Sequence, residues 1–233
     1  MPEKYEILCY GDSNTWGTVA RWNINDPHLR YGRDIRWPCV LQALLGNQYA
    51  VQEEGLGGRT TIYTADPEYP YKNGLYMLEG CLKTHYPLDL IVLMLGTNDL
   101  HLPKPLPEDE LGTGITRLVE VIQAHPEFGP EEKRVPEILL IAPPFITPSA
   151  PEGRTEVYGK FFGEYGERLS HRFPEVYAGI AEKYGCHFLD AQPFTHPDPR
   201  DGVHLDAQSH QKLAHAVRDK VLEIRQKTRR TEL

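Results

Sequence analysis

A nucleophilic side chain, Ser13, lies just after a short apolar run near the beginning of the chain. Residues 5–10 are β-prone and contain no glycine or proline, so they predict a buried strand. Gly11 allows a sharp turn, and Ser13 follows two positions later. Ligands of open α/β sheets bind where strands end, beside backbone N–H groups that favour anions. Because Asp12, Ser13 and Asn14 are also typical helix N-caps, this motif alone leaves a catalytic and a capping interpretation open.

A candidate base and its partner lie near the other end of the chain, where two residues separate Asp201 from His204. Acyl transfer requires a nucleophile, a base, a group that orients the base and donors for the oxyanion. At a turn before a helix, this spacing lets the carboxylate reach the imidazole Nδ1–H. Nε2 then remains available to Ser13, so the three residues form one candidate site.

Two other motifs, a glycine-rich segment and a group of His and Asp residues, could indicate a nucleotide or metal site. Residues 55–61 contain three glycines, but they match neither the dinucleotide-binding fingerprint nor a P-loop. Such glycines also let backbone N–H groups approach a substrate closely. The residues that could bind a metal are close together in the sequence: His196, Asp198, Asp201, His204 and Asp206. Pro197 and Pro199 restrict the backbone of this segment. Because the acyl-transfer interpretation already uses Asp201 and His204, the sequence predicts no metal and no cofactor.

The composition is that of an ordinary globular protein with more acidic than basic residues. The 233 residues are 40% hydrophobic and 25% charged, with a formal net charge of −8. This charge disfavours nucleic acid as a partner. The start has no apolar run of the signal-peptide type, no segment is long enough to span a membrane, and the four cysteines have no CxxC spacing. We therefore expect a cytoplasmic protein with one domain over residues 1–233 and no membrane partner.

The order of predicted elements indicates an α/β fold. Strands are predicted at residues 5–10, 48–54, 88–95, 137–142 and 186–190. Helices are predicted at residues 37–45, 74–82, 106–124, about 160–184 with a break or kink at Pro174, and after Asp206. This alternation favours a parallel five-stranded sheet with helices on both faces, in the flavodoxin-like order 2-1-3-4-5. Every candidate polar segment follows the carboxyl end of a strand, which points to a single site.

Four blocks of the sequence resemble, in type and order, those of the SGNH (GDSL-type) hydrolases. The blocks are Gly11-Asp12-Ser13, Gly58, Gly96-Thr97-Asn98-Asp99, and Asp201 with His204. The resemblance covers essentially the whole chain, and residues 53–61 and 93–99 are similar to the arylesterase/acyltransferase branch. It implies the three-layer fold of that family.

The resemblance also implies roles for individual residues. Ser13 would be the nucleophile, His204 the base and Asp201 the group that orients it. The oxyanion hole would consist of the Ser13 N–H, the Gly58 N–H and the Asn98 side-chain amide. Gly57 leaves a one-residue ambiguity about which glycine donates, and we expect Gly58 to do so.

These roles predict a serine esterase that removes short acyl groups from small esters, with acyl transfer as an additional outcome. A carbohydrate O-acetyl esterase would share every catalytic residue and remains the alternative. A binding module without catalysis, or a flavodoxin-like cofactor binder, is disfavoured by the complete set of catalytic residues and by the lack of a phosphate cradle.

The substrate pocket and the assembly state are further expectations. Asn14, which stands where many family members have leucine, and Trp16 are expected to line the pocket. Trp22 and Tyr31 would either wall the same pocket or belong to the core or a subunit contact. Relatives in this branch tend to oligomerise, so we expect a homo-oligomer, with the polar, aromatic-rich loop at residues 18–36 as its contact.

Overall fold

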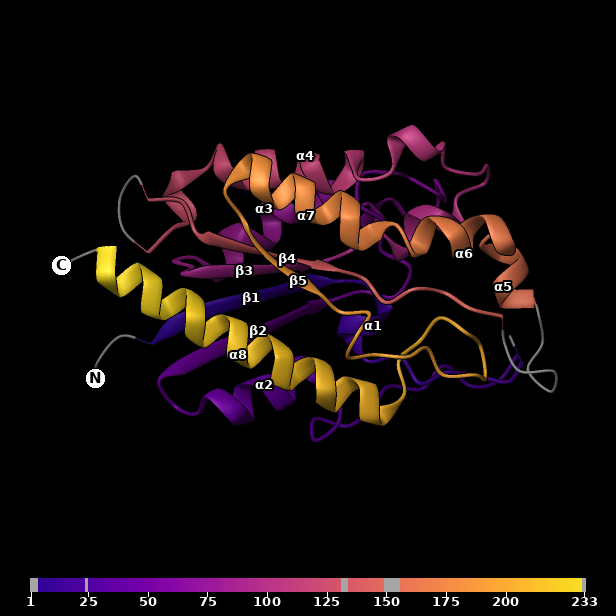
Figure 1. The fold of residues 1–233 in the computed structure, drawn as a ribbon, viewed down its shortest axis with the longest axis horizontal. Helices are drawn as coiled ribbons and strands as arrows, with labels where there is room; N and C mark the ends of the chain where they lie inside the picture. Colours follow the sequence, from indigo (N-terminus) through magenta and orange to yellow (C-terminus); the bar gives the residue numbers. More distant parts are fainter. Residues whose placement is uncertain (1–3, 24, 131–133, 149–155, 232–233) are drawn as a thin grey trace.

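The computed structural model of the chain describes residues 4–23, 25–130, 134–148 and 156–231. At its centre lies a five-stranded sheet in the order β2-β1-β3-β4-β5, in which every neighbouring pair is parallel (Figure 1). The strands are β1 (Tyr5–Gly11), β2 (Tyr49–Gly55), β3 (Leu90–Met94), β4 (Glu137–Ala142) and β5 (His187–Asp190). The predicted strand order and direction are confirmed.

Helices cover both faces of the sheet and form three layers with it (Figure 1). One face carries α2 (Trp37–Leu45) and α8 (Ala207–Thr231). The other carries α3 (Gly74–His85), α4 (Thr113–Gln123) and α7 (Phe173–Tyr184). Three shorter helices are α1 (Ser13–Trp16), α5 (Glu156–Lys160) and α6 (Glu164–Ser170). No helix of the described ranges is both long and apolar enough to cross a bilayer.

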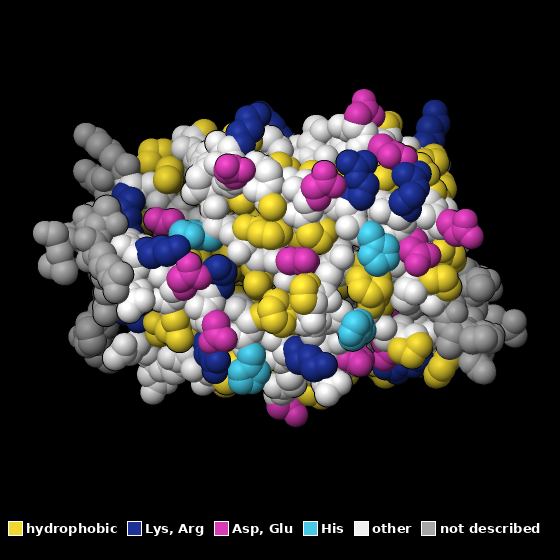
Figure 2. Space-filling model, viewed as in Figure 1, with side chains coloured by type: hydrophobic (Ala, Val, Ile, Leu, Met, Phe, Trp, Pro, Cys, Tyr) yellow, Lys and Arg dark blue, Asp and Glu magenta, His cyan; other side chains and the backbone are white. Residues whose placement is uncertain are grey.

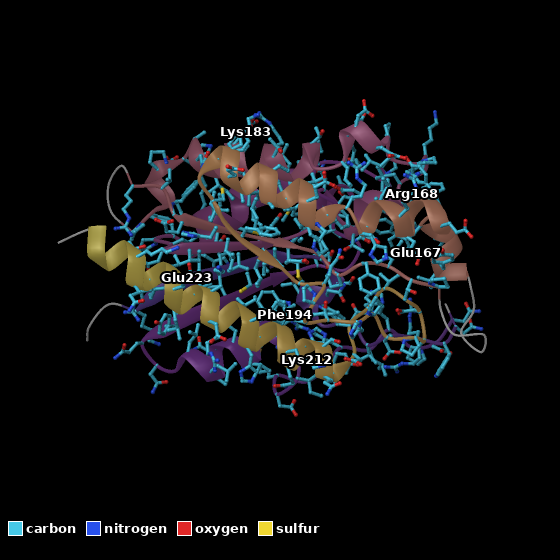
Figure 3. The ribbon with its side chains drawn as sticks, in the orientation of Figure 1. Glu167, Arg168, Lys183, Phe194, Lys212 and Glu223 are labelled. Carbon is cyan, nitrogen blue, oxygen red and sulfur yellow. The ribbon has the colours of Figure 1, made fainter. Side chains whose placement is uncertain are left out.

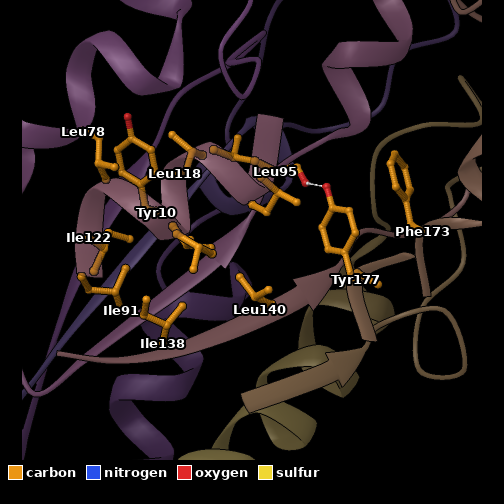
Figure 4. Packing of buried hydrophobic residues seen from close by; sticks show 14 of the residues in the cluster. Tyr10, Leu78, Ile91, Leu95, Leu118, Ile122, Ile138, Leu140, Phe173 and Tyr177 are labelled. Atoms are coloured by element: carbon orange, nitrogen blue, oxygen red, sulfur yellow. Dashed lines mark hydrogen bonds between the residues drawn. The ribbon is translucent and has the colours of Figure 1, made fainter. Parts of the chain in front are cut away.

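The central strands are apolar on both faces because each face packs against helices. Successive side chains of β1 alternate between the two cores: Cys9 packs with α2 and α8, whereas Leu8 and Tyr10 pack with α3 and α4. Tyr10 lies over this second core near Leu78 (Figure 4). Near the end of β3, the Tyr177 hydroxyl donates a hydrogen bond of 2.7 Å to a carbonyl of the adjoining turn (Figure 4). Packing against this core and the Tyr177 hydrogen bond therefore hold the carboxyl ends of β1 and β3 in place.

The spacing of apolar residues in α8 determines which side of this helix faces the sheet. On α8, Lys212 is exposed (Figure 3), whereas Leu213 and Val217 are completely buried against the sheet. Acidic and basic side chains are interspersed over the face of the molecule that contains α8 (Figure 2). The four cysteines are free thiols, as their spacing predicts.

Two predicted helices are shorter or more divided than expected. The helix predicted from residue 106 begins only at Thr113, because Gly112 before it adopts a left-handed φ of 94°. The helix predicted over residues 160–184 is divided into α5, α6 and α7, with a turn at Gly163 (φ 58°) between the first two. Pro174 lies in the first turn of α7, where a missing N–H costs nothing, so it begins a helix instead of kinking one.

The segment predicted as a long loop, residues 18–36, contains no helix among its described residues. A single antiparallel bridge joins Thr18 to Arg30. Trp22 and Leu29 are exposed, with 46% and 56% of their surface accessible. The expected role of this loop in oligomer contacts stays a prediction.

Candidate active site

The turn after β1 places Ser13 at the first position of α1, at the carboxyl edge of the sheet. Asp12 caps this helix, since its carboxylate accepts a hydrogen bond of 2.9 Å from the Asn14 backbone N–H. The end of β2 passes very close: a Cβ on Gly55 would lie 2.2 Å from the Trp16 backbone nitrogen. The capping interpretation of the motif is therefore correct for Asp12, and the Ser13 hydroxyl is left for other contacts.

A chain of hydrogen bonds connects Ser13 to the loop after β5. The His204 Nε2 lies 3.0 Å from the Ser13 Oγ, and the His204 Nδ1 lies 2.7 Å from the Asp201 Oδ2. Because Asp201 is acceptor-only when ionised, it fixes the imidazole tautomer with the proton on Nδ1. Nε2 is then an acceptor for the serine hydroxyl. The arrangement predicted from the two-residue spacing of Asp201 and His204 is present.

The environment of Asp201 keeps it ionised. Burial opposes its charge, but the His204 side chain and the backbone N–H groups of Val203 and His204 all donate to it. These contacts hold the pKa of Asp201 below its usual value. The carboxylate is only 2% exposed, so its charge acts on the imidazole with little solvent screening. The site can therefore stabilise a positive charge that forms on His204.

Asn14 connects α1, the helix that begins at Ser13, to the loop that carries His204. Its Oδ1 accepts a hydrogen bond of 3.0 Å from the Leu205 backbone N–H, and its Nδ2 donates to the Val203 carbonyl at 3.3 Å. These contacts bracket His204 on both sides in the sequence. Asn14 is 2% exposed and is not part of the cavity lining, contrary to the expected pocket position. The physical reason is that its helix turns this side chain toward the His204 loop.

The predicted oxyanion donors gather beside Ser13. Gly57, Gly58 and Asn98 line the same cavity as the serine. Gly58 has a φ of 75°, which favours glycine, whereas Gly57 has no such conformation. Asn98 follows β3 in a 3-10 helix, Thr97–His101, and its Nδ2 donates a hydrogen bond of 3.0 Å to the Arg59 carbonyl. One amide hydrogen is thus held by the protein, and the second is left for a ligand.

Two buried residues for which the sequence predicted no role, Asp99 and Arg59, hold the segment after β2 that contains Gly57 and Gly58. Asp99 accepts hydrogen bonds from Thr61, at 2.8 Å from its backbone N–H and 2.6 Å from its hydroxyl. The Arg59 guanidinium lies over the Tyr10 ring at 4.1 Å and donates to the carbonyls of Gly11 and Glu54. These contacts fasten the segment after β2 to the ends of β1 and β3. The sequence signal was the position of Asp99 directly after Asn98.

Two carboxyl groups near Ser13 are hard to ionise. Burial raises the pKa of Asp12 to about 6, despite the hydrogen bond from the Asn14 N–H. Burial also raises the pKa of Asp99 to about 7, and the charge of Asp12 acts in the same direction, although Thr61 opposes it by hydrogen bonding. Burial therefore opposes the negative charge of both groups.

Ser13 opens into a cavity of about 520 Å³. Trp16 lines it, as predicted, whereas Trp22 and Tyr31 do not; Tyr31 instead packs edge-on against His210 at 5.3 Å. The apolar part of the lining consists of Trp16, Leu56, Tyr71, Val157, Phe161 and Val203. The polar part beyond the predicted catalytic residues consists of Arg21, Asn23, His28, Lys72, His101 and Lys160. The cavity therefore offers both apolar and polar contacts to a small ligand.

The residues considered for a metal site have other partners. Asp198 forms an ion pair with Arg200 at 2.6 Å, and Asp206 accepts a hydrogen bond of 2.6 Å from the Ser209 N–H at the start of α8. Within the described part of the chain, no three His, Cys, Asp or Glu side chains are placed to hold a metal ion. The structure brings Asp201 and His204 to Ser13 instead.

Comparisons with known proteins agree with this geometry. Residues 9–212 match the GDSL-like lipase/acylhydrolase family. A carbohydrate acetylesterase from Sinorhizobium meliloti is 33% identical, with a TM-score of 0.86 over 95% of this chain and 100% of that one. The native aryl esterase of M. smegmatis is 33% identical, with a TM-score of 0.82 over 94% of this chain and 98% of that one.

A curated relative is larger than this chain. An acetylxylan esterase from Xylanibacter ruminicola is 23% identical over an alignment 226 residues long, and the match covers 91% of this chain but only 42% of the relative. The family match extends over most of the sequence and includes the turn with Ser13 and the loop with His204. The chain therefore belongs to the GDSL-like lipase/acylhydrolase family and is a hydrolase that acts on esters.

Proposed function

We propose that the protein is a serine esterase that removes short acyl groups from small carboxylic esters through an acyl-enzyme. The observation that carries this proposal is the hydrogen-bond chain from Ser13 through His204 to Asp201, with contacts of 3.0 and 2.7 Å. A buried carboxylate, an oriented imidazole and a hydroxyl at a cavity are the groups that acyl transfer needs.

The first half of the reaction transfers the acyl group to Ser13. The His204 Nε2 takes the hydroxyl proton as the Oγ forms a bond to the ester carbonyl carbon. The tetrahedral intermediate then expels the alcohol oxygen, which takes that proton from Nε2. Asp201 stays ionised throughout and stabilises the imidazolium. In the second half, a water molecule gives a proton to Nε2 as its oxygen bonds to the acyl carbon. The second tetrahedral intermediate then breaks its bond to Oγ, which takes that proton back from Nε2, so the carboxylic acid leaves and the serine hydroxyl is restored.

The oxyanion would rest on the Ser13 and Gly58 N–H groups and on the Asn98 Nδ2. The Asn98 amide is fixed by its bond to the Arg59 carbonyl, so its second hydrogen needs little reorganisation as negative charge develops. The left-handed conformation of Gly58, at φ 75°, supports this residue over Gly57 as the donor. Acyl transfer to an alcohol instead of water would use the same groups.

An organophosphonate label tests the nucleophile. We expect covalent modification of Ser13 alone, located by peptide mapping, and loss of both labelling and ester hydrolysis in Ser13→Ala. His204→Asn should be equally inactive, whereas His28→Asn is the matched control, because His28 is a second imidazole that lines the cavity and packs against the Trp16 ring at 5.2 Å. Stoichiometric labelling at another residue, with Ser13→Ala still active, would overturn the mechanism.

A carbohydrate O-acetyl esterase is the second candidate, and one observation favours it. The structure of a carbohydrate acetylesterase superposes over 95% of this chain at a TM-score of 0.86. A panel of acetylated sugars measured beside phenyl and alkyl acetates decides between the two substrate classes. Product analysis with added alcohol measures the share of acyl transfer.

A further inference from the structure

The cavity at Ser13 differs in charge from the chain as a whole. The formal net charge of the protein is −8. The described lining of the cavity nevertheless contains Arg21, Lys72 and Lys160, and its one carboxylate is Asp201. That carboxylate is buried and already accepts hydrogen bonds from His204. A ligand in this cavity therefore meets a local excess of positive charge.

Lys72 lies directly beside the oxyanion loop. If Gly58 carried a Cβ, that atom would lie 3.4 Å from the Lys72 Cδ and 3.7 Å from its Nζ. The backbone fixes this proximity, because the Lys72 carbonyl accepts a hydrogen bond of 3.0 Å from the Thr60 N–H. The ammonium also lies over the Tyr69 ring at 4.5 Å. A cation thus lies beside the loop of the predicted oxyanion donors.

Lys160 and His101 line the same cavity as Lys72. His101 ends the 3-10 helix that carries Asn98, and its ring packs against Phe161 at 4.9 Å, next to Lys160 in the chain. Burial lowers the pKa of His101, and the ammonium groups of Lys160 and Lys72 lower it further. His101 is therefore neutral near pH 7 and lies within the electrostatic range of both lysines.

Neither lysine has a carboxylate partner among the described residues. The ion pairs of the described ranges, counted to 4.0 Å, include neither Lys72 nor Lys160. Lys72 is half-buried and Lys160 is exposed. Two cations that line an open cavity, whose one described carboxylate is already paired with His204, are suited to an external anion.

We propose that Lys72, Lys160 and His101 form a subsite for a carboxylate on the substrate, so that the enzyme prefers anionic esters. The inference rests on the proposed function, because it places the carboxylate beside the oxyanion hole of a Ser13 esterase. The carboxylate belongs either to the acyl group or to the alcohol. In both cases the two ammonium groups attract it and His101 donates a hydrogen bond.

Two pairs of matched esters test this subsite. With the charge on the alcohol side, 4-acetoxybenzoate is compared with its neutral analogue 4-acetoxybenzamide. With the charge on the acyl side, ethyl hydrogen succinate is compared with ethyl succinamate. We expect the wild type to hydrolyse the anionic member of at least one pair with a kcat/KM about tenfold higher, and the preferred pair identifies the side. The preference should decrease between 0.05 and 0.5 M salt, since salt screens partly exposed charges.

Variants assign the preference to the lysines. Lys72→Met keeps the length of the side chain and should reduce kcat/KM for the anionic ester about tenfold while changing that for the neutral ester less than about threefold. Lys160→Met should have a smaller effect, about threefold, because exposed ion pairs contribute less than half-buried ones. Lys212→Met, on the exposed face of α8, is the matched control and should change neither rate.

A binding measurement separates failure of the subsite from failure of the proposed function. Calorimetry with 4-acetamidobenzoate and 4-acetamidobenzamide, which replace the ester by an amide, reports anion binding without turnover. The subsite is supported if the wild type binds 4-acetamidobenzoate more tightly than 4-acetamidobenzamide and Lys72→Met abolishes this difference. That result supports the subsite even if Ser13→Ala still hydrolyses esters. The proposal is wrong if the wild type shows no preference for either anionic ester and equal affinity for the two amides. It is also wrong if Lys72→Met retains the full preference.

Discussion

Removal of the Asn14 side chain tests whether this residue positions the base. Asn14→Ala leaves the Leu205 N–H and the Val203 carbonyl without their partners of 3.0 and 3.3 Å. An unsatisfied buried group costs about 1–3 kcal/mol, and the longer bond belongs at the low end of that range. We therefore expect the free energy of unfolding to fall by about 2–4 kcal/mol. Urea titration followed by tryptophan fluorescence measures it.

The same variant should affect catalysis through His204. Because Asn14 holds the residues on both sides of His204, its loss should lower kcat about tenfold and slow phosphonate labelling of Ser13. KM should change little, since Asn14 does not line the cavity. Asn23→Ala is the matched control, because Asn23 is exposed and lines the cavity; it should change KM and leave stability intact. A higher KM in Asn14→Ala, with stability and kcat unchanged, would refute the reasoning and restore the pocket role.

Three other predictions concern the oxyanion side and the cavity. Asn98→Ala should lower kcat about 10²–10³-fold, about 2.7–4 kcal/mol, with KM nearly constant; a change confined to KM in steady-state assays would make Asn98 a binding residue. The pKa of Asp99 is about 7 in the native state and 3.8 in an ordinary aspartic acid. Between these two values the native state retains a proton that the unfolded chain releases. The free energy of unfolding therefore falls as the pH rises from about 4 to 7. Asp99→Asn should remove this part of the fall and leave the part due to Asp12; urea titrations at pH 5 and pH 8 with the same difference as the wild type would contradict it. In a 4-nitrophenyl ester series, kcat/KM should stop rising at about the butyryl ester, although each buried methylene could add about 0.8 kcal/mol; a continued rise beyond eight carbons would reveal an apolar groove.

Much of the fold and the site follows from local sequence patterns. The strands were predictable because runs such as residues 88–95 are apolar on both faces, and a parallel sheet brings their carboxyl ends to one edge. The proximity of Ser13, Asp201 and His204 was predictable because the turn after the first strand and the loop after the last strand meet at that edge, and because the family resemblance relates the three residues. Family membership is confirmed by the match over residues 9–212.

Contacts between distant segments account for the rest. The role of Asn14 depends on the loop at Val203 and Leu205, which lies about 190 residues away in the sequence. The division of the helix predicted over residues 160–184 depends on backbone conformation at Phe162 and Gly163, both with positive φ. Helical periodicity continues through such a turn, so the pattern alone gives no warning of it.

The position of Ser13 at the first strand and of His204 after the last has a consequence for how the protein is made. The two residues are separated by 191 positions, and β5, which precedes the His204 loop, pairs only at the edge of the sheet with β4. A nascent chain that has been synthesised through β4 already contains Ser13, Gly58 and Asn98, but it does not yet contain His204. Under the proposed mechanism the serine hydroxyl is activated only after the ribosome has added the final segment and that segment has docked, so we expect esterase activity to be the last property that the new chain gains.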